Sequence, residues 1–432
     1  MMYHFAAMLS ILLMPFAFVD DTKDSASLAR QDWFKKHVAP IKTIDPKNED
    51  FADLEPIGKA IGSSRIVMLG EQTHGDGATF HAKTRLIKYL HQKHGFDLLV
   101  FESGFYDCHR AWQSIREGKL SPRNAASEGI FGIWTQSQQV QPLLEYLAQQ
   151  ANAKNPLELA GCDSQFTGQA SSTKLPGDLE KVLHAISPDQ FSTAQREAVV
   201  DACKLMTKPD GKLTEDHRLA CTSLAVALKK TAPTQDLPEH ELAYWRQASE
   251  SIAAHANAVQ YADQKDMAKM KKYGNIRDGQ MGKNLVWLAQ QKPQRKIIVW
   301  AASYHTMRNP AQVNDIYRDT VTLGDEAWKV LGKEIYSITF TATEGKWKLP
   351  WWSDDQLRPV AAPTKGSLEE YFTMAGHDYA FVNLRDLPVE GAWLKEKLPA
   401  RPMGYGYMHA SWPESFDGFI FTKKMFGSDR VK

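Results

Sequence analysis

The segment LGEQTHG, residues 69–75, carries two side chains that could act together in acid–base chemistry. Glu71 and His74 lie three positions apart, directly after the apolar run at 65–70. Histidine titrates near neutral pH and can take a proton from water, while a nearby carboxylate orients the imidazole and stabilises its charged form. The alternative is a structural loop in which the glutamate caps backbone amides. We expect the pair to form the centre of a hydrolytic site.

Further polar side chains follow other apolar runs of the chain. Glu102 ends the run at 97–103, Asp163 follows the run at 157–161, and His305 follows the run at 296–302. Ligands of open α/β sheets bind outside the carboxyl ends of the strands, so these groups are expected to converge with the first pair. Taken singly, the glutamate could be a buried ion-pair partner and the histidine a core residue.

Lys83 is a further candidate for the same site. It lies on a predicted helix at 78–95 and shares a face with Phe80 and Ile87, which is unusual for a lysine. A cation there could stabilise an oxyanion or protonate a leaving group. The alternative is a long side chain that reaches solvent along the apolar surface.

Several short apolar runs are nearly continuous in Val, Ile, Leu and Phe, as in strands buried on both faces. Helical stretches at 78–95, which ends at Gly95, and at 137–154 separate the first of them. We therefore predict an α/β fold with a central, mostly parallel sheet flanked by helices. The predicted strands are RIVMLG (65–70), DLLVFES (97–103), LELAG (157–161), KIIVWAA (296–302), EIYSITFT (334–341), YAFVNL (379–384) and DGFIFTK (417–423).

The pattern predicts a division of the chain into a core and an insertion. Residues 30–174 and 290–430 are expected to form an α/β hydrolase-like core, and 175–289 a helical insertion or subdomain. Within the insertion, 237–270 is predicted as helix. The apolar run at 5–19 suits the central region of a signal peptide over residues 1–20, although no Lys or Arg precedes it. Export to the periplasm or medium is expected; a buried N-terminal segment of a cytoplasmic protein is the alternative.

Composition and motifs exclude several classes of function. Lys and Arg number 52 and Asp and Glu 51, so no electrostatic interface for nucleic acid or an anionic membrane is indicated. No Walker motif, GxGxxG or GxSxG is present, and no Cys/His spacing typical of zinc, so no cofactor is predicted. Cys203 and Cys221 flank a short polar link and could form a disulfide or remain buried thiols.

LGEQTHG, followed by KTRLIKYLHQKHGF and LLVFES, resembles the erythromycin esterase family. Further blocks match that family in order, and the resemblance runs from about residue 40 to 425. It is most specific at 69–102 and 296–309. The further blocks are GIFGIWTQSQQVQPLLEYL, LAGCDSQ, NIRDGQMGKNLVWL, GSLEEYF and FDGFIF.

The resemblance implies metal-independent hydrolysis of a small-molecule ester or lactone, with macrolide antibiotics as the family's best-known substrates. It assigns water activation to His74 and orientation of the imidazole to Glu71. Glu102, Lys83 and His305 would position the substrate or stabilise developing charge. Arg277 would contribute to the site or fix the helical insertion in place. The expected substrate-binding residues are Arg277, Asp163, Ser303 and Tyr304.

The sequence departs from the family pattern near the second histidine. The family commonly has W-A-H-N-x-H, whereas this chain has Trp-Ala-Ala-Ser-Tyr-His at 300–305, so Ala302 replaces a histidine. This departure argues against transferring macrolide ring opening to this protein, and it affects the prediction of a hydrolase less.

Two other hypotheses remain open at the level of sequence. A metal-dependent hydrolase could use Glu71, His74, Glu102, Asp163 and His305 as ligands. A non-catalytic exported protein could have kept the fold and bind a small molecule, because a fold does not fix a function. The oligomeric state is not predicted.

Overall fold

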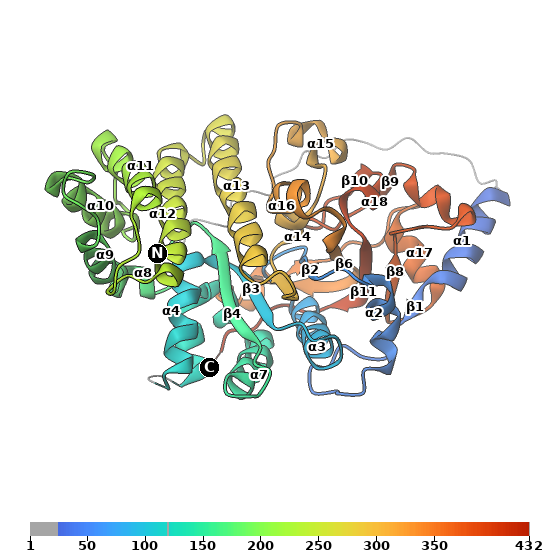
Figure 1. Ribbon diagram of the computed structural model, residues 1–432. Coiled ribbons are helices and arrows are strands. Elements are labelled where there is room, and N and C mark those ends of the chain that lie inside the picture. Colours follow the sequence, from blue (N-terminus) through green and yellow to red (C-terminus); the bar gives the residue numbers. More distant parts are fainter. Residues whose placement is uncertain (1–24, 119–120, 432) are drawn as a thin grey trace.

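The structure, a computed structural model, describes residues 25–118 and 121–431. In this described part, nine strands form one mostly parallel sheet with helices on both faces (Figure 1). The strand order is β1-β8-β11-β6-β2-β5-β3-β4, and β7 pairs with β6. Neighbours from β11 to β4 run parallel, while β8, β1 and β7 are antiparallel to their partners. The predicted α/β class with a mostly parallel sheet is confirmed.

Each apolar run predicted as a strand lies in this sheet. The observed bounds are β1 (Ala39–Pro40), β2 (Ile66–Leu69), β3 (Leu98–Gly104), β4 (Glu158–Asp163), β5 (Ile297–Trp300), β6 (Ile335–Trp347), β7 (Arg358–Pro359), β8 (Tyr379–Asn383) and β11 (Gly418–Met425). A separate two-stranded sheet joins β9 (Leu398–Ala400) to β10 (Met408–Ala410).

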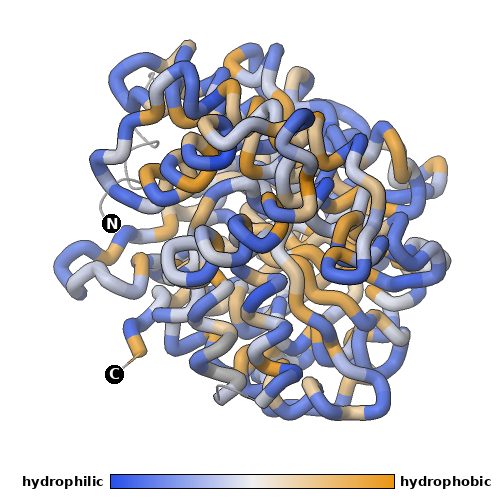
Figure 2. Tube along the Cα trace, turned by 60° about the vertical axis from the view of Figure 1, so that its left-hand side comes forward, coloured by the Kyte–Doolittle hydropathy of each residue, from blue (hydrophilic) through white to orange (hydrophobic). Residues whose placement is uncertain are grey.

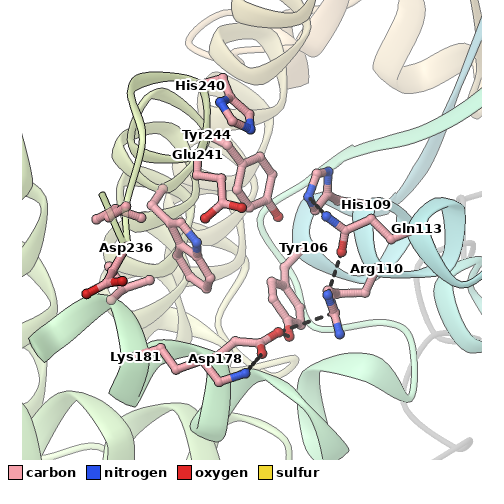
Figure 3. Close-up of a pocket in the computed structure, with 13 residues that line it drawn as sticks. Tyr106, His109, Arg110, Gln113, Asp178, Lys181, Asp236, His240, Glu241 and Tyr244 are labelled. Atoms are coloured by element: carbon pink, nitrogen blue, oxygen red, sulfur yellow. Dashed lines mark hydrogen bonds and ion pairs between the residues drawn. The ribbon is translucent and has the colours of Figure 1, made fainter. Parts of the chain in front are cut away.

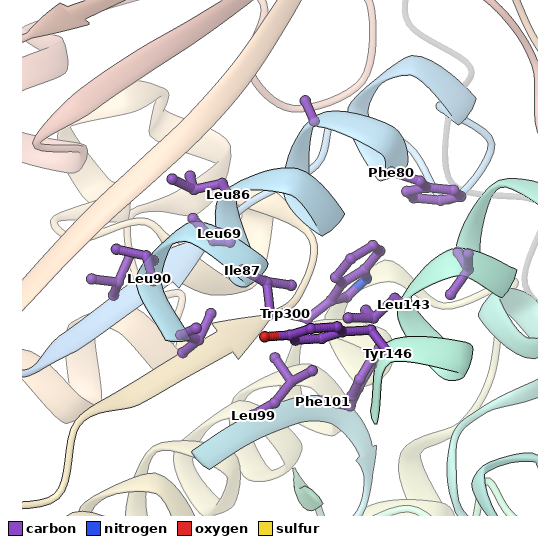
Figure 4. Close-up of a cluster of buried hydrophobic side chains, with 14 of the residues drawn as sticks. Leu69, Phe80, Leu86, Ile87, Leu90, Leu99, Phe101, Leu143, Tyr146 and Trp300 are labelled. Carbon is purple, nitrogen blue, oxygen red and sulfur yellow. The ribbon is translucent and has the colours of Figure 1, made fainter. Parts of the chain in front are cut away.

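The central strands are apolar throughout because helices cover both of their faces. Alternate residues of β2, Val67 and Leu69, face α3 (Gly77–His94) and α7 (Gln141–Gln150), and Figure 4 shows this layer. Ile66 and Met68 face the opposite way, toward α13 (Met267–Gln291) and α16 (Leu323–Leu331). In Figure 2 the apolar strands run through the interior of a mostly hydrophilic outer trace.

The predicted helices are largely present. The helix expected at 78–95 is α3, and Gly95 ends it in the left-handed conformation with φ 68°. The stretch 137–154 contains a 3-10 turn, η2 (Gln138–Val140), followed by α7. The stretch predicted as helix at 237–270 is helical except for a break: α12 (Glu239–Ala258) continues into a 3-10 turn, η3 (Val259–Tyr261), and α13 begins at Met267. Asp266 caps the new helix by accepting hydrogen bonds from the backbone amides of Ala268 and Lys269.

A group of helices lies at one end of the molecule (Figure 1, left) and has its own apolar cluster. The group comprises α8 (Ala170–Thr173), α9 (Leu175–His184), α10 (Thr193–Met206), α11 (Glu215–Lys230) and α12. The cluster also includes Phe105 and Tyr106 of α4 (Phe105–Arg116). By contrast, α13, the last helix of the segment 175–289, packs on the sheet. The division of the chain into domains remains a prediction.

The disulfide considered between Cys203 and Cys221 is not formed. Both are free thiols buried within the cluster of α10 and α11. Burial raises the pKa of each thiol, so both sulfurs stay protonated at neutral pH.

No helix within the described residues is long and apolar enough to cross a bilayer. The signal peptide expected over residues 1–20 lies outside the described residues, and export remains a prediction.

Candidate active site

The order of the strands determines which loops meet at the carboxyl edge of the sheet. The β2–α3–β3 connection passes over β5, which lies between β2 and β3. The residues that follow these three strands are therefore neighbours. The backbone amide of Ser303 donates to the carbonyl of Glu71 at 2.9 Å, and that of Ala302 donates to Glu102 Oε2 at 2.9 Å. The sheet thus brings together Glu71, Glu102 and the turn after β5.

Glu71 is fully buried, and its carboxylate accepts hydrogen bonds from three side chains. Its Oε1 accepts hydrogen bonds from His74 Nδ1 at 2.8 Å and from Trp134 Nε1 at 3.0 Å. Its Oε2 accepts from Lys83 Nζ at 2.7 Å. Both carboxylate oxygens are committed, so the position of this side chain is fixed from three sides.

His74 is the member of this cluster that reaches solvent, with 27% of its side chain exposed. An ionised carboxylate can only accept, so the imidazole proton bonded to Glu71 sits on Nδ1 and the Nε2 lone pair is left on the other side of the ring. The ring also stands edge-on to Trp134, with centroids 5.4 Å apart and planes at 88°. This tautomer, with Nε2 unprotonated, is the one that a general base requires.

Lys83 is buried rather than extended to solvent. Besides its bond to Glu71, its Nζ lies 4.0 Å from the centre of the Trp300 ring and 3.4 Å from the carbonyl oxygen of Ala301. Burial lowers the pKa of Lys83 to about 8, against the opposing attraction of Glu71. The Lys83 ammonium thus balances the charge of Glu71, the carboxylate that also bonds His74.

A second cluster lies at the ends of β3 and β5. Glu102 Oε1 accepts from His305 Nε2 at 3.0 Å and from Arg277 Nη2 at 3.0 Å. Burial raises the pKa of Glu102, but the charges of His305, Arg277 and His74 outweigh it and hold the pKa well below its ordinary value. This carboxylate is ionised at neutral pH.

His305 contacts a carboxylate through each ring nitrogen. Its Nδ1 lies 2.6 Å from Asp278 Oδ1, and its Nε2 contacts Glu102. Burial lowers the pKa of His305, but Asp278 and Glu102 overcome that effect and raise it to about 10. The ring is an imidazolium with both protons engaged, so its role is electrostatic and not that of a base.

Arg277 connects α13 to the ends of β3 and β4. Its Nη2 lies 2.6 Å from Asp163 Oδ2, and its Nε lies 3.0 Å from the same oxygen. With its bond to Glu102, the guanidinium bridges two buried carboxylates. This geometry supports the anchoring role that the sequence left open for Arg277, with Asp163 as its partner.

The turn after β5 holds the remaining sequence candidates. Ser303 is fully buried, and its Oγ lies 2.7 Å from Thr339 Oγ1, away from solvent. Tyr304 is half-buried, with its ring edge-on to His305 at 5.1 Å. Ala302 is partly exposed, directly beside Glu102. Of these residues, Tyr304 and Ala302 are accessible to a ligand.

Several residues that complete these clusters have no functional role predicted from the sequence. Trp134, on α6 (Gly132–Thr135), donates to Glu71, and Asp278 pairs with His305. Asp76 is buried and accepts hydrogen bonds from Thr73 and from Tyr405, which lies far away in the chain. Burial raises the pKa of Asp76 to about 7. Trp134 and Asp278 lie within sequence blocks that resemble the family, and Asp76 directly precedes the helix predicted at 78–95.

The carboxylates of the site are paired with cations of the chain itself. Glu71 pairs with Lys83, and Glu102 and Asp163 pair with Arg277. Among the described residues, no three or more His, Cys, Asp or Glu side chains are arranged as a group that could hold a metal ion. What the arrangement can do is orient His74 and stabilise its protonated form.

Comparison with known proteins shows the family to which this chain belongs. The family model described as erythromycin esterase matches residues 91–425. YbfO of Bacillus subtilis (strain 168), which carries a hydrolase name, is 27% identical over 93% of this chain and 92% of its own length. Erythromycin esterase type II of Escherichia coli is 23% identical over 93% of this chain and 99% of its own length.

Solved structures share the fold. A Bacillus cereus protein superimposes with a TM-score of 0.74 at 21% identity, over 95% of this chain and 100% of its own. A protein named for succinoglycan biosynthesis gives 0.75 at 21% identity, with the same coverage. A mutant of the erythromycin esterase EreC in its open conformation gives 0.64 at 17% identity, over 91% of this chain and 98% of its own. The match of the family model over most of the chain shows that this protein belongs to the erythromycin esterase family, a family of hydrolases.

Proposed function

We propose that this protein hydrolyses a carboxylic ester or lactone with a water molecule activated by His74. The observation that carries the proposal is the 2.8 Å contact between His74 Nδ1 and the buried Glu71, on a ring that is partly open to solvent. A histidine held in one tautomer by a buried carboxylate is the arrangement that acid–base catalysis uses.

In the proposed reaction, His74 Nε2 removes a proton from water as the water oxygen attacks the carbonyl carbon. The imidazolium that forms is stabilised by Glu71, and Glu102 lies close enough to contribute electrostatically. His74 then returns the proton to the alkoxide oxygen as the C–O bond breaks. The products are a carboxylic acid and an alcohol, which remain joined in one molecule if the substrate is a lactone.

A macrolide lactone is the more specific candidate substrate, supported by the E. coli relative named erythromycin esterase type II. Ala302 supplies no side-chain base or donor where the family commonly has a histidine. We expect hydrolysis of esters or lactones in general to depend on this position less than macrolide opening does.

A broad ester and lactone hydrolysis screen, with 14-membered macrolides included and product mass as the readout, tests the proposal. On a substrate that is cleaved, His74→Ala and Glu71→Gln should each lower kcat at least about 100-fold. His184→Ala is the matched control, because this histidine is exposed on α9, outside the site.

Full turnover in both site variants would rule out the mechanism. Hydrolysis that is lost on chelator treatment and restored by one metal per chain would favour the metal-dependent alternative. A small molecule that raises Tm but is recovered chemically unchanged would favour the binding-protein alternative.

A further inference from the structure

A cavity of about 350 Å³ lies between α4, α9 and α12 (Figure 3). This volume falls within the usual range of small-molecule sites, roughly 300–1,000 Å³. None of its lining residues belongs to the clusters around Glu71 and Glu102. The cavity is therefore a separate feature of the helical end of the molecule.

The floor of the cavity is aromatic. Tyr106 and His109 come from α4, and Tyr244 and Trp245 from α12. His109 stacks on Tyr244 with ring centroids 3.9 Å apart, and Trp245 stands edge-on to Tyr244 at 5.7 Å. Aromatic side chains of this kind bind flat apolar groups and cations.

One polar atom of the floor lacks a partner. The hydroxyl of Tyr244 is buried and makes no hydrogen bond to any described residue. Figure 3 shows this phenol directed from α12 into the space between α12 and α4. A buried hydroxyl without a partner costs free energy, which a ligand group that bonds to it would recover.

The charges around the cavity sum to a net negative value. Asp178 is engaged, because it accepts from Tyr106 Oη at 2.6 Å and lies 3.3 Å from Arg110 Nε. Lys181 is exposed, with its Nζ 3.8 Å from Asp178. Asp236 and Glu241 are exposed at the rim, and their side chains form no ion pair or hydrogen bond with any described residue.

Three carboxylates thus face two cations. The imidazole of His109 adds no charge at pH 7, because burial, aided by Arg110, lowers its pKa to about 4 against the effect of Asp178. Tyr106 and Tyr244 are neutral phenols, since burial raises the pKa of both. The remaining titratable lining group, His240, is exposed on α12.

We propose that this cavity is a binding site for a small organic amine with a planar apolar body. The aromatic floor takes the apolar body, Tyr244 Oη bonds a polar atom on its edge, and Asp236 and Glu241 attract the ammonium group. The proposal concerns a site separate from the hydrolytic one and does not depend on the reaction catalysed there.

Tryptamine is a suitable probe, with indole-3-propionate as the anion of similar shape. Isothermal titration calorimetry of the full protein at pH 7 and low salt should show one tryptamine site per chain. We expect indole-3-propionate to bind at least about tenfold more weakly, because the rim repels it. His74→Ala should leave the tryptamine affinity unchanged, which locates binding away from the hydrolytic cluster.

Variants of the lining identify the contacts. Glu241→Gln should weaken tryptamine binding about two- to fivefold, as expected for a partly screened charge pair. Tyr244→Phe keeps the ring and removes the hydroxyl, and should weaken binding about fivefold. Glu180→Gln is the matched charge control, since Glu180 is exposed on α9 and does not line the cavity. Val182→Trp should fill the cavity and abolish binding.

Saturable tryptamine binding that is weakened by Tyr244→Phe and Glu241→Gln, but not by Glu180→Gln, supports the site. Equal binding of the anion, loss of binding in His74→Ala, or no saturable binding at all would overturn it. Because Tyr244→Phe and Glu241→Gln remove one polar group each and leave the packing in place, the test stands even if Val182→Trp fails to fold.

Discussion

Two histidines near the ends of β2 and β5 meet carboxylates in different ways. His74 contacts one carboxylate through Nδ1 and keeps a partly exposed ring. His305 is buried and contacts carboxylates through both nitrogens. The first geometry leaves a nitrogen free to accept a proton, whereas the second binds both protons tightly. The same residue type therefore serves as the proposed base in one case and as a fixed positive charge in the other.

The fixed charge on His305 predicts a pH dependence of stability. The folded-state pKa of about 10 lies above the ordinary value of 6.5, so the folded state binds the proton more tightly. The stabilisation is fully present below pH 6.5 and is lost as pH rises toward 10. Across that window the lost free energy is on the order of 5 kcal/mol.

Chemical denaturation of the wild type and of His305→Gln across pH 6 to 10 measures this effect. The wild type should lose its stability advantage over the variant as pH rises. His184→Ala serves as the histidine control, because that side chain is exposed on α9, outside the cluster around Glu102. A difference between wild type and His305→Gln that does not change with pH would contradict the assignment of a charged His305.

At the scale of elements, the site depends on how closely the ends of β2 and β5 approach. A Cβ atom on Gly70 would lie 2.5 Å from Ser303 Oγ and 3.0 Å from Ser303 Cα. The same turn is tied to Glu71 by the backbone bond from Ser303. A glycine is therefore required here because two strand ends meet, and not because a left-handed backbone is needed.

Gly70→Ala should push the two strand ends apart. We expect a loss of about 1–3 kcal/mol in the free energy of unfolding and a fall in kcat, because Glu71 follows directly in the chain. Gly177→Ala is the matched control, because the residue is in helix α9 and its added Cβ would meet no described atom within 4 Å beyond its chain neighbours and the helix's own backbone. That variant should be neutral or slightly stabilising.

Denaturant unfolding and kcat, measured together, check the prediction for Gly70. Wild-type stability and turnover in Gly70→Ala would show that the strand ends tolerate separation. The double variant Gly70→Ala/Ser303→Gly should recover part of the loss, since it removes the serine side chain that the new methyl group meets.

At the scale of the whole molecule, α13 joins the helical end to the sheet. One part of the helix packs on β2, β3 and β5 through Met281, Leu285 and Ala289. Arg277 of the same helix bridges Glu102 and Asp163 at the ends of β3 and β4. Through these buried ion pairs, α13 connects the helical end of the molecule to the candidate active site.

Arg277→Leu should destabilise the protein by about 3–5 kcal/mol, because it removes the cation paired with buried Asp163 and one of the two cations paired with buried Glu102. Arg318→Leu is the control, since that arginine is 69% exposed and pairs with Asp315 on the surface; it should cost less than about 1 kcal/mol. Thermal and denaturant unfolding measure both variants. Equal free energies of unfolding for Arg277→Leu and Arg318→Leu would show that the ion pairs of Arg277 with Glu102 and Asp163 do not stabilise the fold.

The sequence by itself determined the strands, the class of the sheet and the Glu71–His74 pair. Continuous apolar runs exist because both faces of the central strands are covered, and the polar residues that follow those runs lie at the carboxyl ends of the strands. Those features are local in the chain, so their pattern can be seen without a structure. The family resemblance rested on the same local blocks and is confirmed by the family model.

Only the tertiary structure decided which side chains the candidate site residues contact. The position of β5 between β2 and β3 brings Glu102 to His305, and no local pattern encodes that strand order. Trp134 and Asp278 reach their partners from other parts of the chain. Ser303 proved buried, and the two thiols proved free. Such contacts arise from long-range packing, because side chains distant in sequence meet only when the whole sheet and its covering helices are assembled.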